Sequence, residues 1–228
     1  SESILTERQQ EIASPLAQQR DLYYLSKRRV AEEAEHRRLY CLQAMQIAMA
    51  ARSRILKDHK DGEECRDQGF TRAQTLIIVP FRNAAFDCIS VMASLWRDRE
   101  SGSTGPQVEN WSRFMEEYNQ VEAEDDQEAE FMNESRRRDA RPADFKHTFR
   151  GNIDDCFRIG IKFTRKSMKL FADFYSADVI IASPLGLRLV IDGAEKNMKS
   201  WGDWDFLSSL NCSFWIKLKL LTCKIGNI

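Results

Sequence analysis

The 228-residue sequence lacks the glycine-rich loop with which nucleotide-hydrolysing proteins hold phosphates. Its first glycine is Gly62, and none of its ten glycines is followed by lysine. Such a loop needs backbone N–H groups of glycines around the phosphates, followed by lysine and then serine or threonine. The sequence therefore predicts no nucleotide cofactor and no catalytic residues for nucleotide hydrolysis.

The spacing of cysteines and histidines also matches neither a metal site nor a disulfide framework. The six cysteines form no C-x-x-C pair, and the three histidines are scattered along the chain. Zinc sites and disulfide frameworks depend on close, regular spacing of these residues. The sequence predicts no metal site, and it places Cys41 and Cys88 on apolar helix faces as core residues.

Neither one sign of charge nor a long apolar run dominates the chain. Lys and Arg number 34 against 35 Asp and Glu, a net charge of −1, so any contact with RNA has to be local. No apolar run approaches the ~20 residues that a bilayer-spanning helix needs. No signal peptide is present either, and we expect a soluble intracellular protein without a membrane partner.

Three segments have the patterns of β-strands. Residues 157–163 alternate between apolar and polar side chains, whereas 74–79 and 179–182 are apolar on both faces, as central parallel strands are. From Ser167 the apolar residues recur at three- and four-residue spacing, which predicts an amphipathic helix between the strands at 157–163 and 179–182. Residues 149–190 are thus expected to form a parallel βαβ unit.

Proline ends both of the apolar strands. Pro80 and the pair Ser183–Pro184 each stand before a helical pattern, and Ser183 is suited to cap its helix. The apolar residues assigned to these two helices are Ala84, Ala85, Cys88, Ile89, Met92 and Leu95, and then Leu185, Leu187, Leu189 and Val190. Two strand–proline–helix units predict a three-layer α/β domain with ligand-binding loops at the carboxyl ends of its strands.

The predicted organisation has three parts. Residues 1–60 form a helical segment, because 27–57 contain neither glycine nor proline and carry an apolar face, with Glu33 and Arg37 among the exposed charges. Residues 61–210 form the α/β lobe, with an irregular insertion at 101–141. Its Trp111, Phe114, Met115 and Tyr118 are spaced as on a short helix that contacts the body of the domain. Residues 211–228 form a divergent tail.

Four separate motifs carry a resemblance to a known family. They are RDQGFTR at 66–72, LIIVPFRNAA at 76–85, FRGNIDDCFRIG at 149–160 and FYSADVIIASPLGLR at 174–188. In this order they resemble the digestive organ expansion factor family of U3 small-nucleolar-RNA-associated pseudo-helicases. The resemblance implies a RecA-like lobe related to DEAD-box helicases but without their catalytic motifs.

The resemblance also implies a location and partners. The family's setting is the nucleus, in particular the nucleolus, where it is part of the small-subunit processome and supports pre-rRNA processing and 18S rRNA maturation. The implied partners are U3 snoRNA, pre-rRNA and processome proteins. After residue 210 the chain departs from the family, whose degenerate acidic motif and second lobe we expect to be missing, so the fold is incomplete and truncated at its C-terminus.

The comparison with helicases also suggests RNA-binding residues. Pro80–Phe81–Arg82 and Ser183–Pro184–Leu185–Gly186 stand at the positions of two RNA-gripping loops of helicases. We therefore take Arg82, Ser183 and Arg188 as candidate contacts with the RNA backbone, since helix N-termini and arginines attract phosphates. The alternative is that Ser183 only caps a helix, while Arg82 and Arg188 are solvated or paired with acids.

These observations favour a non-catalytic component of the processome that acts by binding. An ATP-dependent RNA helicase fragment is the alternative from the enzyme class, and the missing phosphate-binding loop speaks against it. A pure protein-interaction scaffold, which never touches RNA, is the other alternative.

Overall fold

The computed structural model describes residues 7–18, 22, 30–61, 73–98, 107–119, 142–192, 205–210 and 212–215. The RDQGFTR motif at 66–72, residues 101–106 and 120–141 of the insertion, and residues 216–228 of the tail lie outside the described residues. No helix in the described ranges is long and apolar enough to cross a membrane.

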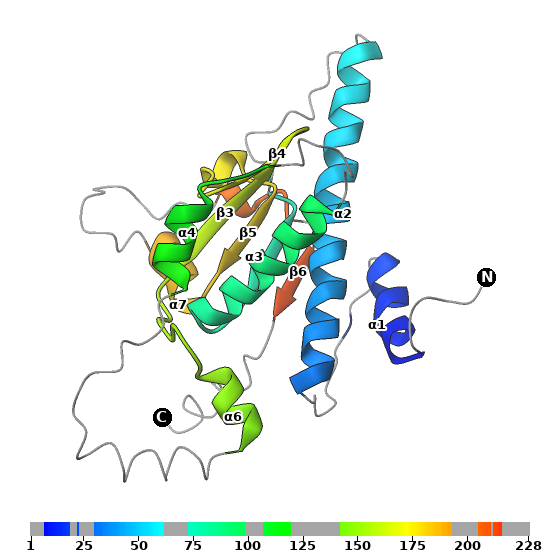
Figure 1. Cartoon of the computed structure of the whole chain (residues 1–228). Coiled ribbons are helices and arrows are strands. Elements are labelled where there is room, and N and C mark those ends of the chain that lie inside the picture. Colours follow the sequence, from blue (N-terminus) through cyan, green and yellow to red (C-terminus); the bar gives the residue numbers. More distant parts are fainter. Residues whose placement is uncertain are drawn as a thin grey trace.

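A six-stranded mixed sheet forms the centre of the domain, in the order β2-β4-β3-β5-β1-β6 (Figure 1). Three neighbouring strands, β5, β1 and β6, are parallel, whereas β3 is antiparallel to both β4 and β5. The strands are β1 (Thr75–Ile78), β2 (Gln107–Glu109), β3 (Arg158–Phe163), β4 (Ser167–Leu170), β5 (Val179–Ala182) and β6 (Cys212–Trp215). The α/β class predicted from the sequence is confirmed, but the sheet is not wholly parallel.

The two apolar strands are central and fully buried, as predicted. All four residues of β1 and all four of β5 are buried, and the two strands pair in parallel with Ile77 opposite Ile181. Because both faces of these strands are covered, apolar side chains are needed at every position. Their loops leave the sheet at the same edge.

The predicted helix after Ser167 is wrong. Ser167–Leu170 is a strand, β4, which forms an antiparallel hairpin with β3 and pairs Phe163 with Met168. A tight turn closes the hairpin, since the N–H of Thr164 donates to the carbonyl of Ser167 over 2.8 Å. Met168 is buried and Lys169 exposed, so the local period is two. The expected parallel βαβ unit is therefore a hairpin followed by a short connection.

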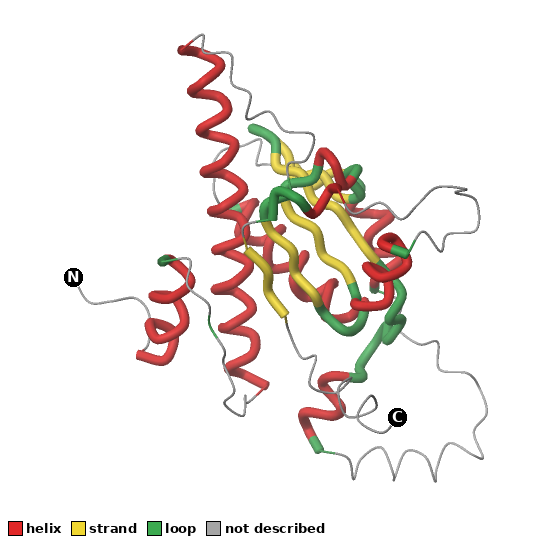
Figure 2. Tube along the Cα trace, turned by 180° about the vertical axis from the view of Figure 1, so that it is seen from behind, coloured by secondary structure: helices red, strands yellow, loops and turns green. Residues whose placement is uncertain are grey.

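Helices cover both faces of the sheet. In Figure 1, α3 crosses in front of the strands and α2 stands beside them, next to β6, and Figure 2 shows the strands from the opposite side. Both views show α2 running past the end of the sheet. The helices are α1 (Glu7–Ala17), α2 (Val30–Asp61), α3 (Arg82–Arg97), α4 (Trp111–Tyr118), α6 (Ala143–Thr148) and α7 (Pro184–Ile191), with 3₁₀ turns η1 (Phe174–Ser176) and η2 (Asp205–Leu207).

Each face of the sheet has its own hydrophobic core. Ile77 and Ile181 point to the face covered by α2, α3 and α4, while Ile180 points to the other face. On that second face, Leu187 and Val190 of α7 pack beside Phe206, but Leu185 is exposed, contrary to expectation. The predicted three-layer arrangement is confirmed, because apolar residues alternate between two helix-covered faces.

The short helix expected inside the insertion is α4, and it contacts the body of the domain as predicted. Phe114 and Tyr118 are buried, and the ring of Phe114 stacks on that of Phe86 in α3, with centroids 5.5 Å apart. The segment predicted as a divergent tail contributes the edge strand β6, which pairs Cys212 with Thr75.

Helix α2 buries polar groups as well as apolar ones. Glu33 and Arg37, expected among the exposed charges, are 9% and 8% exposed. Arg37 lies three and four residues before Tyr40 and Cys41, so helical periodicity turns it to the same packed face. Its guanidinium contacts Glu33 over 3.3 Å and Asp87 of α3 over 3.2 Å.

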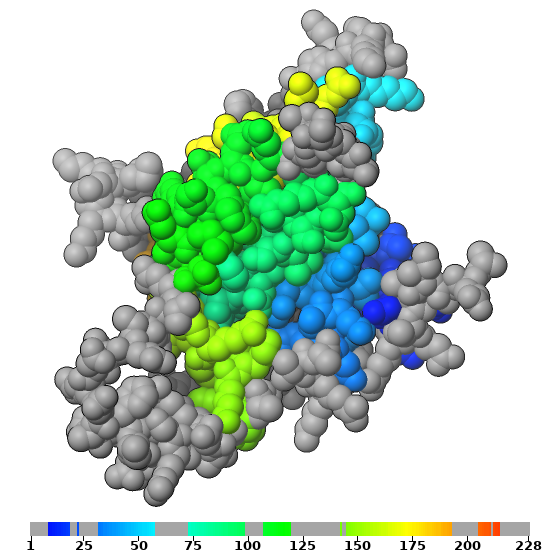
Figure 3. Space-filling model, in the orientation of Figure 1, coloured from blue at the N-terminus to red at the C-terminus, as the bar shows by residue number. Residues whose placement is uncertain are grey.

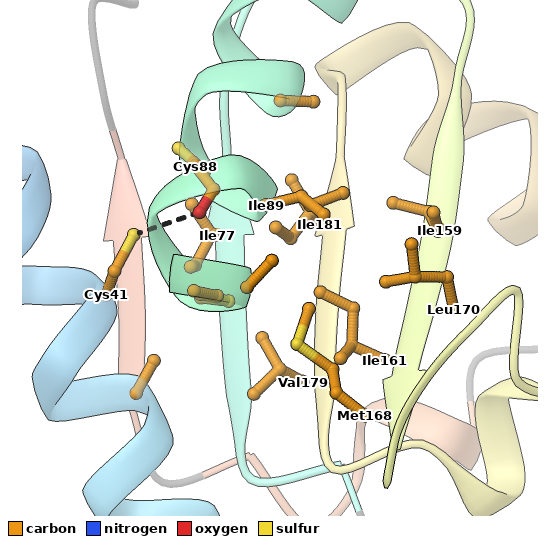
Figure 4. Packing of buried hydrophobic residues seen from close by; sticks show 14 of the residues in the cluster. Cys41, Ile77, Cys88, Ile89, Ile159, Ile161, Met168, Leu170, Val179 and Ile181 are labelled. Carbon is orange, nitrogen blue, oxygen red and sulfur yellow. Dashed lines mark hydrogen bonds between the residues drawn. The ribbon is translucent and has the colours of Figure 1, made fainter. Parts of the chain in front are cut away.

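Cys41 and Cys88 are core residues, as predicted. Both are fully buried, and the Sγ of Cys41 donates to the backbone carbonyl of Cys88 over 3.6 Å (Figure 4). The hydroxyl of Tyr40 lies 3.3 Å from the Sγ of Cys88. Burial raises the pKa of the Cys41 thiol, so this thiol stays protonated and joins α2 to α3 as a neutral group.

Candidate nucleic-acid interface

The N-terminus of α3 follows β1, and its first backbone N–H groups are hydrogen-bonded to the segment before β3. The backbone N–H groups of Arg82 and Asn83 donate to the carbonyls of Asp154 and Asn152 over 3.0 and 2.9 Å. The amide of Asn83 also donates to the carbonyls of Thr148 and Arg150. These first N–H groups of the helix, which would otherwise suit a phosphate, are thus already paired within the protein.

The side chain of Arg82 is held from several sides. Its Nε donates to Oδ2 of Asp154 over 2.8 Å, and its terminal nitrogens reach the carbonyls of Glu117 and Cys156, each over 3.4 Å. The guanidinium carbon lies 5.0 Å from the centre of the Tyr118 ring. With a side chain only 20% exposed, Arg82 joins α3 to α4 and to the segment before β3.

Ser183 caps α7, as the sequence predicted. Its Oγ accepts from the N–H of Gly186 over 2.9 Å and from the N–H of Phe157 over 3.3 Å. Its own N–H donates to the carbonyl of Phe157 over 3.0 Å. Ser183 has no exposed surface, because the start of β3 covers it.

Arg188 lies on the outer side of α7. Its side chain is 78% exposed, and its Nε donates to Oδ2 of Asp192 over 3.0 Å, one helical turn away. Exposed pairs of this kind contribute little to stability. Of the three candidate contacts, Arg188 is the one that stands in solvent.

The parallel pairing of β1 and β5 brings the two loops to one edge of the sheet, as expected. The contacts of the three residues fit the alternative that Ser183 caps a helix and the arginines pair with acids. A direct contact of these residues with RNA stays a prediction.

A cavity of about 460 Å³ opens beside Arg82 at the same edge. Its walls come from α3, α4, the start of β3 and the connection between β4 and β5. It is lined by Arg82, Arg113, Glu117, Tyr118, Cys156, Phe157, Arg158, Ile159, Gly160, Phe171, Ala172, Asp173 and Phe174. In Figure 3, α3, α4 and the segment around α6 form one continuous face.

One arginine of this cavity was missed from the sequence. Arg113 lies on α4 with its guanidinium carbon 4.0 Å from the centre of the Phe171 ring, and its Nε donates to Oε1 of Glu117 over 2.7 Å. The helical spacing of Trp111, Phe114 and Tyr118 located α4 but gave no reason to single out Arg113. Burial raises the pKa of Tyr118, which keeps its hydroxyl protonated.

The described loops after the parallel strands do not resemble a phosphate-binding loop. β1 continues through Val79, Pro80 and Phe81, and β5 through Ser183 and Pro184, so no glycine precedes either helix. Proline supplies no backbone N–H, and the N–H groups of Arg82, Asn83 and Gly186 bind carbonyl or hydroxyl oxygens of the protein. Neither loop offers the nest of free N–H groups that nucleotide phosphates need.

Comparison with known proteins gives a consistent result. The family model described as "UTP25, NTP hydrolase-like domain" matches residues 19–221. A U3 small nucleolar RNA-associated protein 25 homolog of Xenopus tropicalis is 39% identical over 218 residues, covering 92% of this chain and 26% of its own length. The U3 small nucleolar RNA-associated protein 25 of Pyricularia oryzae is 39% identical over 89% of this chain. The homolog of Rattus norvegicus is 36% identical over 92% of this chain.

No solved structure matches the chain. The chain spans about a quarter of the length of these curated relatives. The sheet topology and the matched family model together define an α/β domain of the NTP-hydrolase-like class. Within that class the chain belongs to the UTP25 family, as the four sequence motifs indicated.

Proposed function

We propose that this chain is a non-catalytic domain of the small-subunit processome, which supports pre-rRNA processing and 18S rRNA maturation in the nucleolus. Its partners are U3 snoRNA, pre-rRNA and processome proteins. The observation that carries the proposal is membership of the UTP25 family over residues 19–221, with relatives named as U3 small nucleolar RNA-associated proteins. The domain acts by binding, and the exposed Arg188 at the carboxyl edge of β1 and β5 supplies local positive charge.

We predict that the purified chain neither binds ATP tightly nor hydrolyses it, with or without RNA. The loops after β1 and β5 lack a glycine nest, and no lysine follows any glycine in the sequence. The measurements are ATP titration by calorimetry and phosphate release in the presence of single-stranded RNA. ATPase activity that a point substitution in the domain abolishes would favour the helicase alternative.

RNA binding is tested with the Arg82→Ala/Arg188→Ala double variant. If these arginines contact phosphates, the variant binds all RNA sequences more weakly to a similar extent, and its affinity depends less steeply on salt. The slope of log K against log salt should flatten by about 0.7 for each lost contact with single-stranded RNA. The single variants serve as controls, because Arg82 also holds Asp154 whereas Arg188 contacts only Asp192 among the described residues.

An exposed aromatic surface favours a second candidate, docking of a processome protein. Phe145 lies in α6 and is 39% exposed, and Phe149, the C-cap of this helix, is 36% exposed. Their ring centroids lie 4.5 Å apart. Ile153, which is 44% exposed, follows on the same segment. A folded double variant with unchanged affinity and salt slope for RNA would make this protein-docking function the better one.

A further inference from the structure

The cavity beside Arg82 presents two guanidinium groups placed over aromatic rings. Arg113 lies over Phe171 at 4.0 Å and Arg82 over Tyr118 at 5.0 Å, and the two rings are 6.4 Å apart. Glu117 binds both arginines. Its carboxylate accepts from Nε of Arg113 over 2.7 Å, and its backbone carbonyl accepts from the Arg82 guanidinium over 3.4 Å. Unpaired bases of RNA stack on such aromatic rings and on guanidinium planes.

The backbone at Phe171 adopts a strained conformation. Its φ is +57°, a left-handed value that a bulky residue rarely adopts. Two neighbours hold it there: the amide of Asn110 donates to the carbonyl of Leu170 over 2.8 Å, and the N–H of Ala172 donates to the carbonyl of Gly160 over 2.9 Å. Strain of this kind is concentrated at ligand sites.

Gly160 makes this arrangement possible. A Cβ at position 160 would lie 2.4 Å from the carbonyl oxygen of Ala172, so only glycine lets the strained segment approach β3. The chain thus combines a glycine, an asparagine and a left-handed phenylalanine to bring one aromatic ring to the wall of the cavity. The ring stands under Arg113, whose side chain is 60% exposed.

Size and charge indicate the kind of ligand. About 460 Å³ is within the range of small-ligand pockets, which is roughly 300–1,000 Å³. Three arginines and two acids line the cavity, and Arg82 is also paired with Asp154 beside it. Carboxylates such as that of Glu117 accept from base amino groups, and guanidinium groups donate to phosphate and to base carbonyls.

We propose that this cavity takes one unstacked nucleotide of a single-stranded RNA. The base stacks against the Arg113–Phe171 and Arg82–Tyr118 pairs, and its phosphate faces the arginines. The site differs from the loop contacts at Ser183 and Arg188, which do not line the cavity. The inference deepens the proposed function and rests on it, because it assumes that the domain meets RNA.

The test measures binding of a fluorescein-labelled single-stranded RNA of about ten nucleotides, a length within the range of known single-strand sites. Phe171→Gly removes the ring and lets the backbone keep its φ without strain, but it also removes the packing of the ring against the core under α3 and α4. Circular dichroism therefore checks that the variant is folded before its affinity is compared. We expect its affinity and that of Arg113→Gln to fall about 5- to 150-fold, the effect of losing the stacking of one base.

Arg97→Gln is the matched control. Arg97 lies over Trp111 at 5.1 Å in the same kind of cation–π contact, but it does not line the cavity. Its substitution should leave RNA affinity unchanged. Ultraviolet crosslinking of the bound RNA, followed by peptide mapping, should place the crosslink at Phe171 or Tyr118.

The outcomes separate the two proposals. If the unchanged chain binds RNA and Phe171→Gly and Arg113→Gln bind it equally well, the cavity assignment is wrong and the proposed function stands. If the unchanged chain binds no RNA, both the cavity assignment and the RNA part of the proposed function fail. Adenosine monophosphate serves as the free-nucleotide probe: failure to displace the RNA at equal concentration supports a strand-borne nucleotide, and binding as tight as that of RNA overturns it.

Discussion

The Gly186→Ala variant is expected to be less stable than the unchanged chain by about 2–4 kcal/mol. A Cβ at position 186 would lie 2.1 Å from the carbonyl oxygen and 2.7 Å from the carbonyl carbon of Phe157. Both are backbone atoms at the start of β3, so no side-chain rotation relieves the clash. The first turn of α7 would have to move away from the sheet.

That movement breaks the contacts around Ser183. The same residue, Phe157, exchanges hydrogen bonds with the backbone and the hydroxyl of Ser183, and the Ser183 Oγ caps Gly186. Loss of the cap alone costs about 1 kcal/mol. In thermal unfolding followed by circular dichroism, the melting temperature should fall by roughly 5–15 °C for a domain of this size.

Gly151→Ala is the matched control for this prediction. Gly151 has a φ of +62°, but a Cβ there would meet nothing within 4 Å. Its substitution should cost only about 1 kcal/mol, which is the penalty for a left-handed alanine. A melting temperature of Gly186→Ala equal to or above that of Gly151→Ala would contradict the close packing of α7 on β3.

Local sequence patterns predicted the elements that are buried on both sides. β1, β5 and α3 follow from uninterrupted or helically spaced apolar residues, and Ser183–Pro184 marked the start of α7. These signals are strong because burial on both faces leaves no freedom in residue type. The same approach predicted a helix where strand β4 lies, because four residues give too little periodicity to distinguish a strand from the first turn of a helix.

The residues of the candidate site were harder to predict, for a different reason. Arg82 and Asp154 are 72 positions apart, so no local pattern announces their ion pair. The positive φ of Phe171 goes with contacts of its neighbours Leu170 and Ala172 to Asn110 and Gly160, which are distant from each other in sequence and carry no turn signature together. Arg82 and Ser183 were correctly placed at the ends of strands, but only the structure shows that their polar groups are engaged within the protein.

Ile180→Asp is the second large effect that we expect, and it should unfold the domain or cost several kcal/mol. Ile180 is 1% exposed in β5, the strand between β3 and β1, and it packs in the core with Leu76, Ile78 and Phe206. A buried carboxylate without partners costs an amount comparable to the ~5–15 kcal/mol stability of a whole domain.

Asp178, two residues earlier, shows what a buried carboxylate needs in this sheet. It is 5% exposed, and its Oδ2 accepts from the backbone N–H of Phe163 over 2.7 Å, just before β5 begins. At position 180 the backbone N–H groups of the neighbouring strands already serve the sheet ladder, since Ile180 pairs with Leu76 on one side and Gly160 on the other. An aspartate there would find no donor of this kind.

The dependence on pH distinguishes a buried charge from lost packing. Burial raises the folded-state pKa of an aspartate at position 180 above its unfolded value of about 3.9, so Ile180→Asp should lose stability progressively as the pH rises from about 4 to 7. Ile180→Asn has the same shape without the charge and should show no such additional loss, while Ile180→Val should cost only about 0.5–1.5 kcal/mol at any pH. Urea unfolding of the three variants across this pH range measures the difference. A soluble Ile180→Asp variant with an unchanged unfolding midpoint would show that β5 is not the buried central strand described here.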